Sequence, residues 1–233
     1  MIAVILLSAN ALAGERLFAW TYGSGTVPQG GVEIEHYLTA QTHGGPDVTD
    51  WQHQLELEYG VTDNLELGLY IVGEQVGSGP LNFAAYKGRF RYRLAPVGSW
   101  PVDVAVYGEY VGHPGENERA LEEKIILERA VGKRFVAAMN ITAEQEFEGS
   151  EVEIVLEPTL GLGVHIVPWF TVGAEAKYEQ VIGEGPMAWA GPSVHVAGKG
   201  GRLWWTVAGM YALTEDTRAD AVWQVRSLLA LNL

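Results

Sequence analysis

Basic side chains recur at every second position between residues 87 and 93. Lys87, Arg89, Arg91 and Arg93 alternate there with Gly88, Phe90, Tyr92 and Leu94. Alternate residues of a β-strand point to the same side of the sheet, so the four cations would share one face. Such a row of cations can pair with carboxylates as a structural network, or it can select solutes by charge in a pore.

Carboxylates on neighbouring segments are the candidate partners of this basic face. They are Glu56, Glu58, Glu66, Asp103 and Glu109. Antiparallel pairing across a turn at 95–100 would bring Arg93 near Asp103. The same pairing would bring Lys87 near Glu109.

Pairing across a second turn, at 60–64, would set Glu58 near Glu66. Like charges that face each other repel, and a basic strand beside them relieves the repulsion. We interpret the four cations and five carboxylates as an ion-pair network, with a selectivity constriction as the alternative.

A second acidic group surrounds a predicted hairpin at 147–151, where Glu146 can pair opposite Glu153. Its members are Glu144, Glu146, Glu151, Glu153 and Glu157. Carboxylates at a pore mouth favour cations, and oxygen-rich clusters suit Ca²⁺ or Mg²⁺, including ions that bridge lipopolysaccharide. A solvated acidic loop is the simpler alternative.

Ser193 and His195 are two residues apart and would share one face of a strand. A serine and a histidine support acyl hydrolysis when a third residue orients the histidine. No recognisable motif accompanies the pair, and the sequence has no Gly-rich phosphate loop, HExxH or EF-hand spacing. We therefore expect no enzyme activity, catalytic residue or cofactor, and a lipid-modifying enzyme is a remote alternative.

Hydrophobicity with a period of two dominates the chain and predicts β-strands. Between turn signals we expect twelve strands, at 30–41, 50–60, 64–73, 82–95, 101–112, 119–131, 134–147, 151–165, 169–181, 187–198, 202–213 and 220–232. Residues 117–131, taken alone, could also form an amphipathic helix. An even number of strands of about ten residues, with short turns alternating with longer loops, is typical of an up-and-down transmembrane β-barrel.

Aromatic residues near the strand ends favour a membrane barrel over a soluble sandwich. Trp100, Trp169, Phe170, Trp204 and Trp205 lie beside the short turns, and Trp51, Tyr110, Phe147 and Trp223 lie near the opposite ends. Aromatic girdles of this kind mark the two membrane interfaces. The net charge of −14 argues against a nucleic-acid partner, whose phosphates require Lys and Arg.

The first residues suggest export. An apolar run from Ile2 to Leu7 and the small residues of Ala11-Leu12-Ala13 predict a signal peptide at 1–13, although no basic residue precedes the run and a buried strand is the alternative. Residues 14–29 would be an N-terminal arm, a lumenal plug or an extra strand. The barrel would occupy 30–233.

Two segments resemble small porin-like outer-membrane proteins, which are largely uncharacterised or described as transporters. They are Leu55 to Gly68 (LELEYGVTDNLELG), which resembles a hairpin of that group, and Val27 to Glu35 (VPQGGVEIE), which resembles its first strand. The resemblance implies a bacterial outer-membrane barrel.

We therefore expect a narrow passive pore for small cationic or neutral solutes, with an acidic lumen. The alternative is a non-conducting structural or partner-binding barrel with an ion-paired, plugged lumen. The expected partners are the lipid bilayer, lipopolysaccharide, small solutes and, during insertion, the barrel-assembly machinery.

Overall fold

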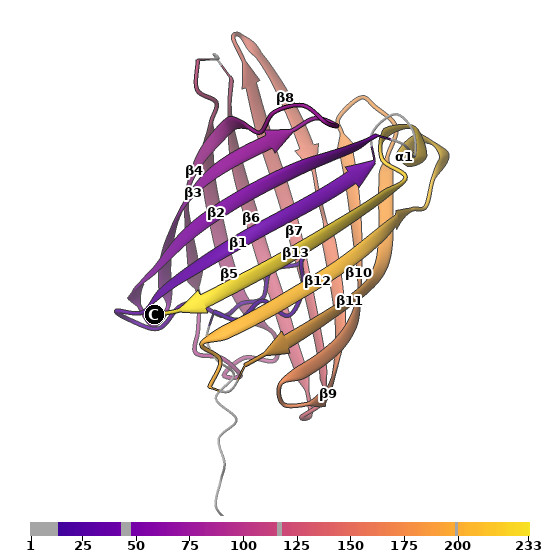
Figure 1. Ribbon diagram of the computed structural model, residues 1–233. Helices are drawn as coiled ribbons and strands as arrows, with labels where there is room; N and C mark the ends of the chain where they lie inside the picture. Colours follow the sequence, from indigo (N-terminus) through magenta and orange to yellow (C-terminus); the bar gives the residue numbers. More distant parts are fainter. Residues whose placement is uncertain (1–13, 43–47, 116–117, 199) are drawn as a thin grey trace, which may run out of the picture.

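The protein is a closed antiparallel β-barrel of twelve strand positions (Figure 1). The computed structural model describes residues 14–42, 48–115, 118–198 and 200–233. The strands are β1 (Val32–Thr42), β2 (Thr49–Thr62), β3 (Leu65–Gln75), β4 (Asn82–Arg93), β5 (Asp103–Gly112), β6 (Glu118–Val131), β7 (Phe135–Glu148), β8 (Glu151–Leu156), β9 (Thr159–Val167), β10 (Phe170–Val181), β11 (Met187–Ala197), β12 (Leu203–Ala212) and β13 (Trp223–Asn232). β1 pairs with β13, which closes the barrel and leaves no free edge.

One strand position is divided in two. β8 and β9 both lie between β7 and β10 and are separated only by Glu157 and Pro158. Proline cannot donate to the ladder, but its carbonyl accepts from Tyr178 N at 3.0 Å, and Glu157 N donates to Thr142 O at 3.0 Å. The ladder therefore continues through the interruption, and the predicted count of twelve strands is confirmed.

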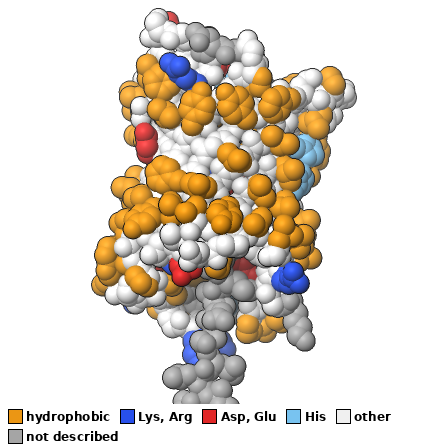
Figure 2. All heavy atoms as spheres, turned by 90° about the vertical axis from the view of Figure 1, so that its left-hand side faces the viewer, with side chains coloured by type: hydrophobic (Ala, Val, Ile, Leu, Met, Phe, Trp, Pro, Cys, Tyr) orange, Lys and Arg blue, Asp and Glu red, His pale blue; other side chains and the backbone are white. Residues whose placement is uncertain are grey.

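The two faces of the wall differ as period-two alternation predicts. Leu55, Leu57 and Tyr59 are nearly half exposed on the outside, whereas Glu56 and Glu58 between them are fully buried inside. On the face shown in Figure 2, apolar side chains cover much of the outer surface and charged ones are sparse. An apolar exterior around a barrel whose backbone groups are paired within the sheet is what a bilayer requires.

The two ends of the barrel carry different connections. β1 begins and β13 ends at one end, which also holds the tight turns, such as 63–64 and 132–134. We call this the turn end, and in outer-membrane barrels such turns face the periplasm. The opposite loop end holds most of the longer connections, including the short helix α1 (Glu215–Asp220), which was not predicted, but also the tight β7–β8 turn at 149–150. No helix among the described residues is long and apolar enough to cross a bilayer.

Residues 14–27 lie inside the barrel, where Figure 1 shows an indigo trace, and residues 28–30 are exposed at the turn end. The segment returns to the turn end before β1, where Gly30 N donates to Gly60 O at 2.8 Å and Gly60 N to Gly31 O at 3.1 Å. None of residues 14–31 belongs to a strand of the sheet. The predicted signal peptide at 1–13 lies outside the described residues.

Two other expectations need correction. Residues 118–131 form strand β6, so the helical alternative for this region is wrong. Trp204 does not join an aromatic girdle: it is 1% exposed and points into the lumen, where its indole N–H donates to Glu33 at 3.0 Å. Trp100, Trp169 and Trp205 of the same predicted girdle are exposed on the outside.

Candidate functional site

A single carboxylate of the wall holds the backbone of the lumenal segment. Glu175 on β10 accepts hydrogen bonds from Ala19 N at 2.8 Å, Trp20 N at 2.8 Å and Thr21 N at 3.0 Å. Glu175 is 2% exposed. A buried carboxylate needs such donors, and these three amides would otherwise lack partners inside the lumen. The contact satisfies both groups at once.

Side chains of β7, β6 and β3 also hold the same segment. Asn140 on β7 exchanges two hydrogen bonds with Tyr22, through Tyr22 N at 2.7 Å and Tyr22 O at 3.0 Å. Glu128 on β6 accepts from Ser24 N at 2.6 Å, and Glu66 on β3 accepts from Val27 N at 2.7 Å. The segment is therefore anchored to β3, β6, β7 and β10, and it crosses the lumen from one wall to another.

Glycines in the wall make room for the segment's aromatic side chain. Phe18 is 2% exposed, and a Cβ at Gly161 would lie 2.7 Å from its ring, closer than packing allows. Gly163 and Gly173 face the same ring. The alternation of apolar residues with glycines predicted these strands. The sequence alone does not show that the space left by the glycines holds the Phe18 ring.

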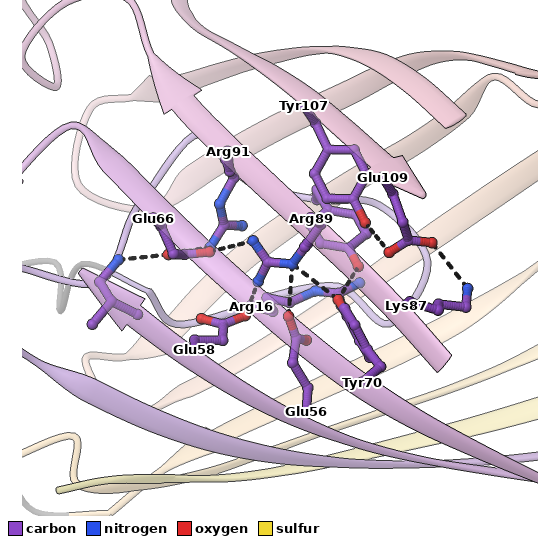
Figure 3. A network of polar contacts seen from close by, with 12 residues as sticks. Arg16, Glu56, Glu58, Glu66, Tyr70, Lys87, Arg89, Arg91, Tyr107 and Glu109 are labelled. Atoms are coloured by element: carbon purple, nitrogen blue, oxygen red, sulfur yellow. Dashed lines mark hydrogen bonds and ion pairs between the residues drawn. The ribbon is translucent and has the colours of Figure 1, made fainter. Parts of the chain in front are cut away.

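Arg89 lies at the centre of the predicted ion-pair network (Figure 3). Its guanidinium contacts Glu56 at 2.6 Å, Glu66 at 2.6 Å and also Glu58. Arg91 donates twice to Glu66, at 2.8 and 2.9 Å. The side chains of all five residues are at most 1% exposed, so the structure brings them together as one buried cluster.

The remaining four members of the predicted network lie apart from this cluster. Lys87 pairs with Glu109 at 3.0 Å, as expected. Arg93 donates instead to Asp63 O at 2.6 Å and to the Asn64 side chain, and Asp103 accepts from Gly98 N at 2.6 Å.

The expected Arg93–Asp103 contact is therefore wrong. The register sets Arg93 opposite Ala105, which leaves Asp103 beyond it, at the start of β5. There Asp103 closes the connection between β4 and β5 while Arg93 closes the β2–β3 turn.

A cavity of about 210 Å³ lies in the lumen beside the segment. We call it the vestibule; Trp20 and Tyr22 of the segment line it together with side chains of the wall. Its charged lining residues are Lys87, Lys124, Lys177, Arg226, Glu109, Glu122, Glu144 and Glu157. The lining also includes three wall tyrosines and the amides of Gln52, Gln54 and Asn140.

Most cations of the vestibule are paired. Lys124 contacts Glu122 at 2.9 Å, and Lys177 contacts Glu157 at 3.0 Å and Glu179 at 2.8 Å. Arg226 differs, because its Nε donates to Thr39 Oγ1 at 2.9 Å and its guanidinium lies 5.1 Å from the Trp20 ring centre. Arg226 makes no ion pair with a carboxylate among the described residues.

The predicted acidic mouth is divided between two places. Glu144 and Glu157 line the vestibule, whereas Glu146, Glu151 and Glu153 are exposed on the β7–β8 hairpin at the loop end. Glu146 does pair opposite Glu153, as the turn position predicts.

Sequence reasoning missed two lumenal acids at the beginning of β1. Glu33 and Glu35 are both fully buried, and they lie opposite Glu58 and Glu56 of β2. The same alternation that identified the acids of β2 runs through Val32-Glu33-Ile34-Glu35, so the signal was present.

Ser193 and His195 both face the lumen and are 2–3% exposed. His195 Nδ1 lies 2.8 Å from Thr206 Oγ1, and its Nε2 is 3.8 Å from Glu15. Among the described residues the two side chains form no hydrogen bond with each other. The geometry is therefore not that of a serine nucleophile beside its general base.

Comparisons with known proteins agree with this architecture. Residues 10–98 match a family of unknown function (DUF6662). No curated protein matches the sequence. Similar solved structures are the KdgM porin in complex with disordered oligogalacturonate (TM-score 0.62, 8% identity, 86% of this chain and 97% of that chain), the COG4313 outer membrane channel from Pseudomonas putida F1 (0.61, 10%, 89% and 97%) and the NanC porin (0.60, 7%, 87% and 100%).

The chain has the fold of small outer-membrane porins. The predicted resemblance to such proteins is confirmed at the level of the fold. The closed wall and its apolar exterior identify an integral protein of the bacterial outer membrane, where barrels of this type occur.

Proposed function

We propose that the protein is an outer-membrane channel for small polar solutes, and that residues 14–27 close its lumen in the described conformation. The observation that carries this proposal is the anchoring of the segment to wall strands around the lumen, above all by the three backbone N–H groups that donate to Glu175. Displacing the segment from these anchors would open the pore.

The vestibule favours neutral or zwitterionic solutes. Its lining holds four cationic and four carboxylate side chains, so its formal charge is balanced. Aromatic rings and amides lie beside these charges and suit a small polar ligand that offers both apolar faces and hydrogen-bonding groups. The exposed acids of the β7–β8 hairpin would favour cations over anions on the approach to the pore.

A non-conducting barrel that binds a partner is the second candidate, and the same anchored segment favours it. The two proposals differ in whether the segment moves. In both, the lipid bilayer surrounds the wall, and we propose that lipopolysaccharide contacts the loop end and that the barrel-assembly machinery inserts the chain.

A cross-link tests whether the segment closes the pore. The sequence contains no cysteine, so Phe18→Cys combined with Gly161→Cys introduces one defined pair where the added Cβ would lie 2.7 Å from the Phe18 ring. We expect transient openings of the refolded parent in planar bilayers, no openings of the oxidised pair, and their return on reduction. Steady conductance that is the same in the oxidised and reduced pair would show that an open path runs past the segment.

Glu175→Gln separates the two candidates. The amide keeps the shape of the side chain but loses the charge that receives three backbone N–H groups, so openings should become more frequent. Glu153→Gln is the control, because this substitution removes the same charge from a residue that is exposed on the hairpin. Silence of the folded parent, of Glu175→Gln and of the reduced cysteine pair would exclude the channel and favour the non-conducting barrel.

A further inference from the structure

Three carboxylates meet at the turn end of the lumen, outside the vestibule. Glu33 and Glu35 on β1 approach Glu58 on β2, and oxygen atoms of all three lie within 4.8 Å of one another. Each of the three residues is 0% exposed. A Cβ at Gly14 would lie 3.6 Å from a Glu33 oxygen, so the group also borders the start of the lumenal segment.

Four of the six carboxylate oxygens in this group lack hydrogen-bond donors among the described residues. Glu33 Oε1, both oxygens of Glu35 and Glu58 Oε2 are buried and have no partner among the described residues. The other Glu33 oxygen receives the Trp204 indole N–H at 3.0 Å, and the other Glu58 oxygen contacts Arg89. Buried carboxylate oxygens without donors are strongly unfavourable, so these four oxygens require a positive ligand or protons.

The charge of the surrounding cluster points to the same requirement. Its five buried carboxylates are Glu33, Glu35, Glu56, Glu58 and Glu66, and its three buried guanidiniums are Arg16, Arg89 and Arg91. Arg16 is connected to the cluster through Tyr37, whose hydroxyl accepts from Arg16 at 2.8 Å and donates to Glu56 at 2.7 Å. Five negative and three positive charges leave a formal charge of −2. One divalent cation would balance that charge without a change in protonation.

We propose that Glu33, Glu35 and Glu58 bind one calcium ion. Ca²⁺ accepts six to eight oxygen ligands in flexible geometry and binds a carboxylate through one or both of its oxygens. Mg²⁺ demands near-ideal octahedral geometry and keeps several waters. Three converging carboxylates with four free oxygens suit the former. The ion would hold β1 and β2 together beside residues 14–16. Calcium binding does not depend on conduction. A test can therefore exclude the calcium site and leave the channel proposal intact, or exclude the channel and leave the site intact.

Terbium luminescence measures the site directly, because Tb³⁺ replaces Ca²⁺ and is excited by a nearby indole. Trp204 donates to Glu33 and is therefore next to the proposed ion. We expect one sensitised Tb³⁺ per refolded barrel, displaced by CaCl₂ far more readily than by MgCl₂. Trp204→Phe should weaken the luminescence while calorimetry still detects Ca²⁺ binding.

Glu35→Gln is the decisive variant, and Glu146→Gln with Glu153→Gln is the control for ions held by the exposed hairpin. Glu35→Gln should abolish the sensitised signal, and the control should keep it. In a chelator, Glu35→Gln should fold at least as well as the parent, since it removes an uncompensated buried charge. At ten times the Kd, calcium should raise the urea midpoint of the parent by about 0.5–1.4 M and leave that of Glu35→Gln unchanged.

Two results would overturn the site. One is a folded parent that binds neither Tb³⁺ nor Ca²⁺ at millimolar concentration, which would mean that protons neutralise the cluster. The other is binding that survives Glu35→Gln but is lost in the hairpin control or in Glu144→Gln, which would place the ion on the hairpin or in the vestibule.

Discussion

At the scale of single residues, Arg89 compensates more buried charge than any neighbour in its cluster. Its guanidinium contacts three carboxylates, Glu56, Glu58 and Glu66, and all four side chains are 0% exposed. Removing one partner of a buried ion pair leaves the other charge without compensation, which typically costs more than the pair itself contributes. The barrel should therefore tolerate the loss of Arg89 poorly.

Arg89→Met should lower the free energy of unfolding by about 3–5 kcal/mol, measured by urea unfolding in detergent or lipid. Arg119→Met is the matched control: Arg119 is exposed near the loop end, and its loss should change stability by less than about 0.5 kcal/mol. Equal effects of the two substitutions would mean that the cluster contributes no more than a surface arginine.

The sequence predicts which residues of this cluster face inward but not how they connect. Period-two alternation placed Glu56, Glu58 and Arg89 on the lumenal side, where they lie. It could not show that one guanidinium reaches carboxylates on β2 and β3, because those contacts use the space left by Gly68, where a Cβ would lie 2.8 Å from Arg89 Nε. Arg93 shows the same limit, since hydrogen bonds to the β2–β3 turn replace its expected ion pair.

At the scale of elements, the end of β2 fixes the exit of the lumenal segment. Gly60 is buried beneath Pro28, and a Cβ there would lie 2.1 Å from Pro28 O and 2.5 Å from Val27 O. Both contacts are with backbone, so no side-chain rotation can relieve them. A side chain at Gly60 must therefore displace residues 27–31 from the wall.

Gly60→Ala should destabilise the protein by about 1–3 kcal/mol through this overpacking. It should also speed amide hydrogen exchange at residues 19–21, whose N–H groups donate hydrogen bonds to Glu175. Gly88→Ala is the control, because a Cβ there meets only Leu69 at an ordinary 3.7 Å. Unchanged exchange in Gly60→Ala would show that the segment is held independently of its exit.

Strand positions could be predicted closely because turn residues interrupt a regular alternation. The predicted strand at 151–165 is observed as β8 and β9, and its single proline accounts for the break. α1 was missed because its six residues are too few for helical periodicity to appear. The path of residues 14–31 could not be predicted, since alternation at Phe18–Tyr22 fits an arm, a plug and a strand equally well.

At the scale of the whole molecule, the excess of acidic residues is largely not available to solutes. Backbone N–H groups of the lumenal segment donate hydrogen bonds to three of these acids, Glu175, Glu128 and Glu66. In the vestibule lining, four carboxylates are balanced by four cationic side chains. A count of inward acids and bases therefore overstates the negative charge that a permeating solute meets. The exposed acids that a solute meets at the loop end include those of the β7–β8 hairpin.

That hairpin sets carboxylates directly opposite one another. Glu146 pairs opposite Glu153, and Glu148 opposite Glu151, all of them exposed at the loop end. In water, a unit charge acts on a cation about 10 Å away with about 0.4 kcal/mol before screening, and salt weakens this further. We expect the hairpin to adjust cation preference modestly rather than to impose strict selectivity.

Glu146→Gln with Glu153→Gln should therefore lower the ratio of potassium to chloride permeability by about twofold. The measurement is the reversal potential under a KCl gradient, made in the Glu175→Gln background, where the segment is expected to release more often. Glu184→Gln is the control, since Glu184 is exposed in another connection of the loop end. The effect should shrink as salt rises, because screening acts on exposed charges first. An unchanged permeability ratio in the double variant would place the selective charges inside the vestibule, with Glu144 and Glu157, instead of on the hairpin.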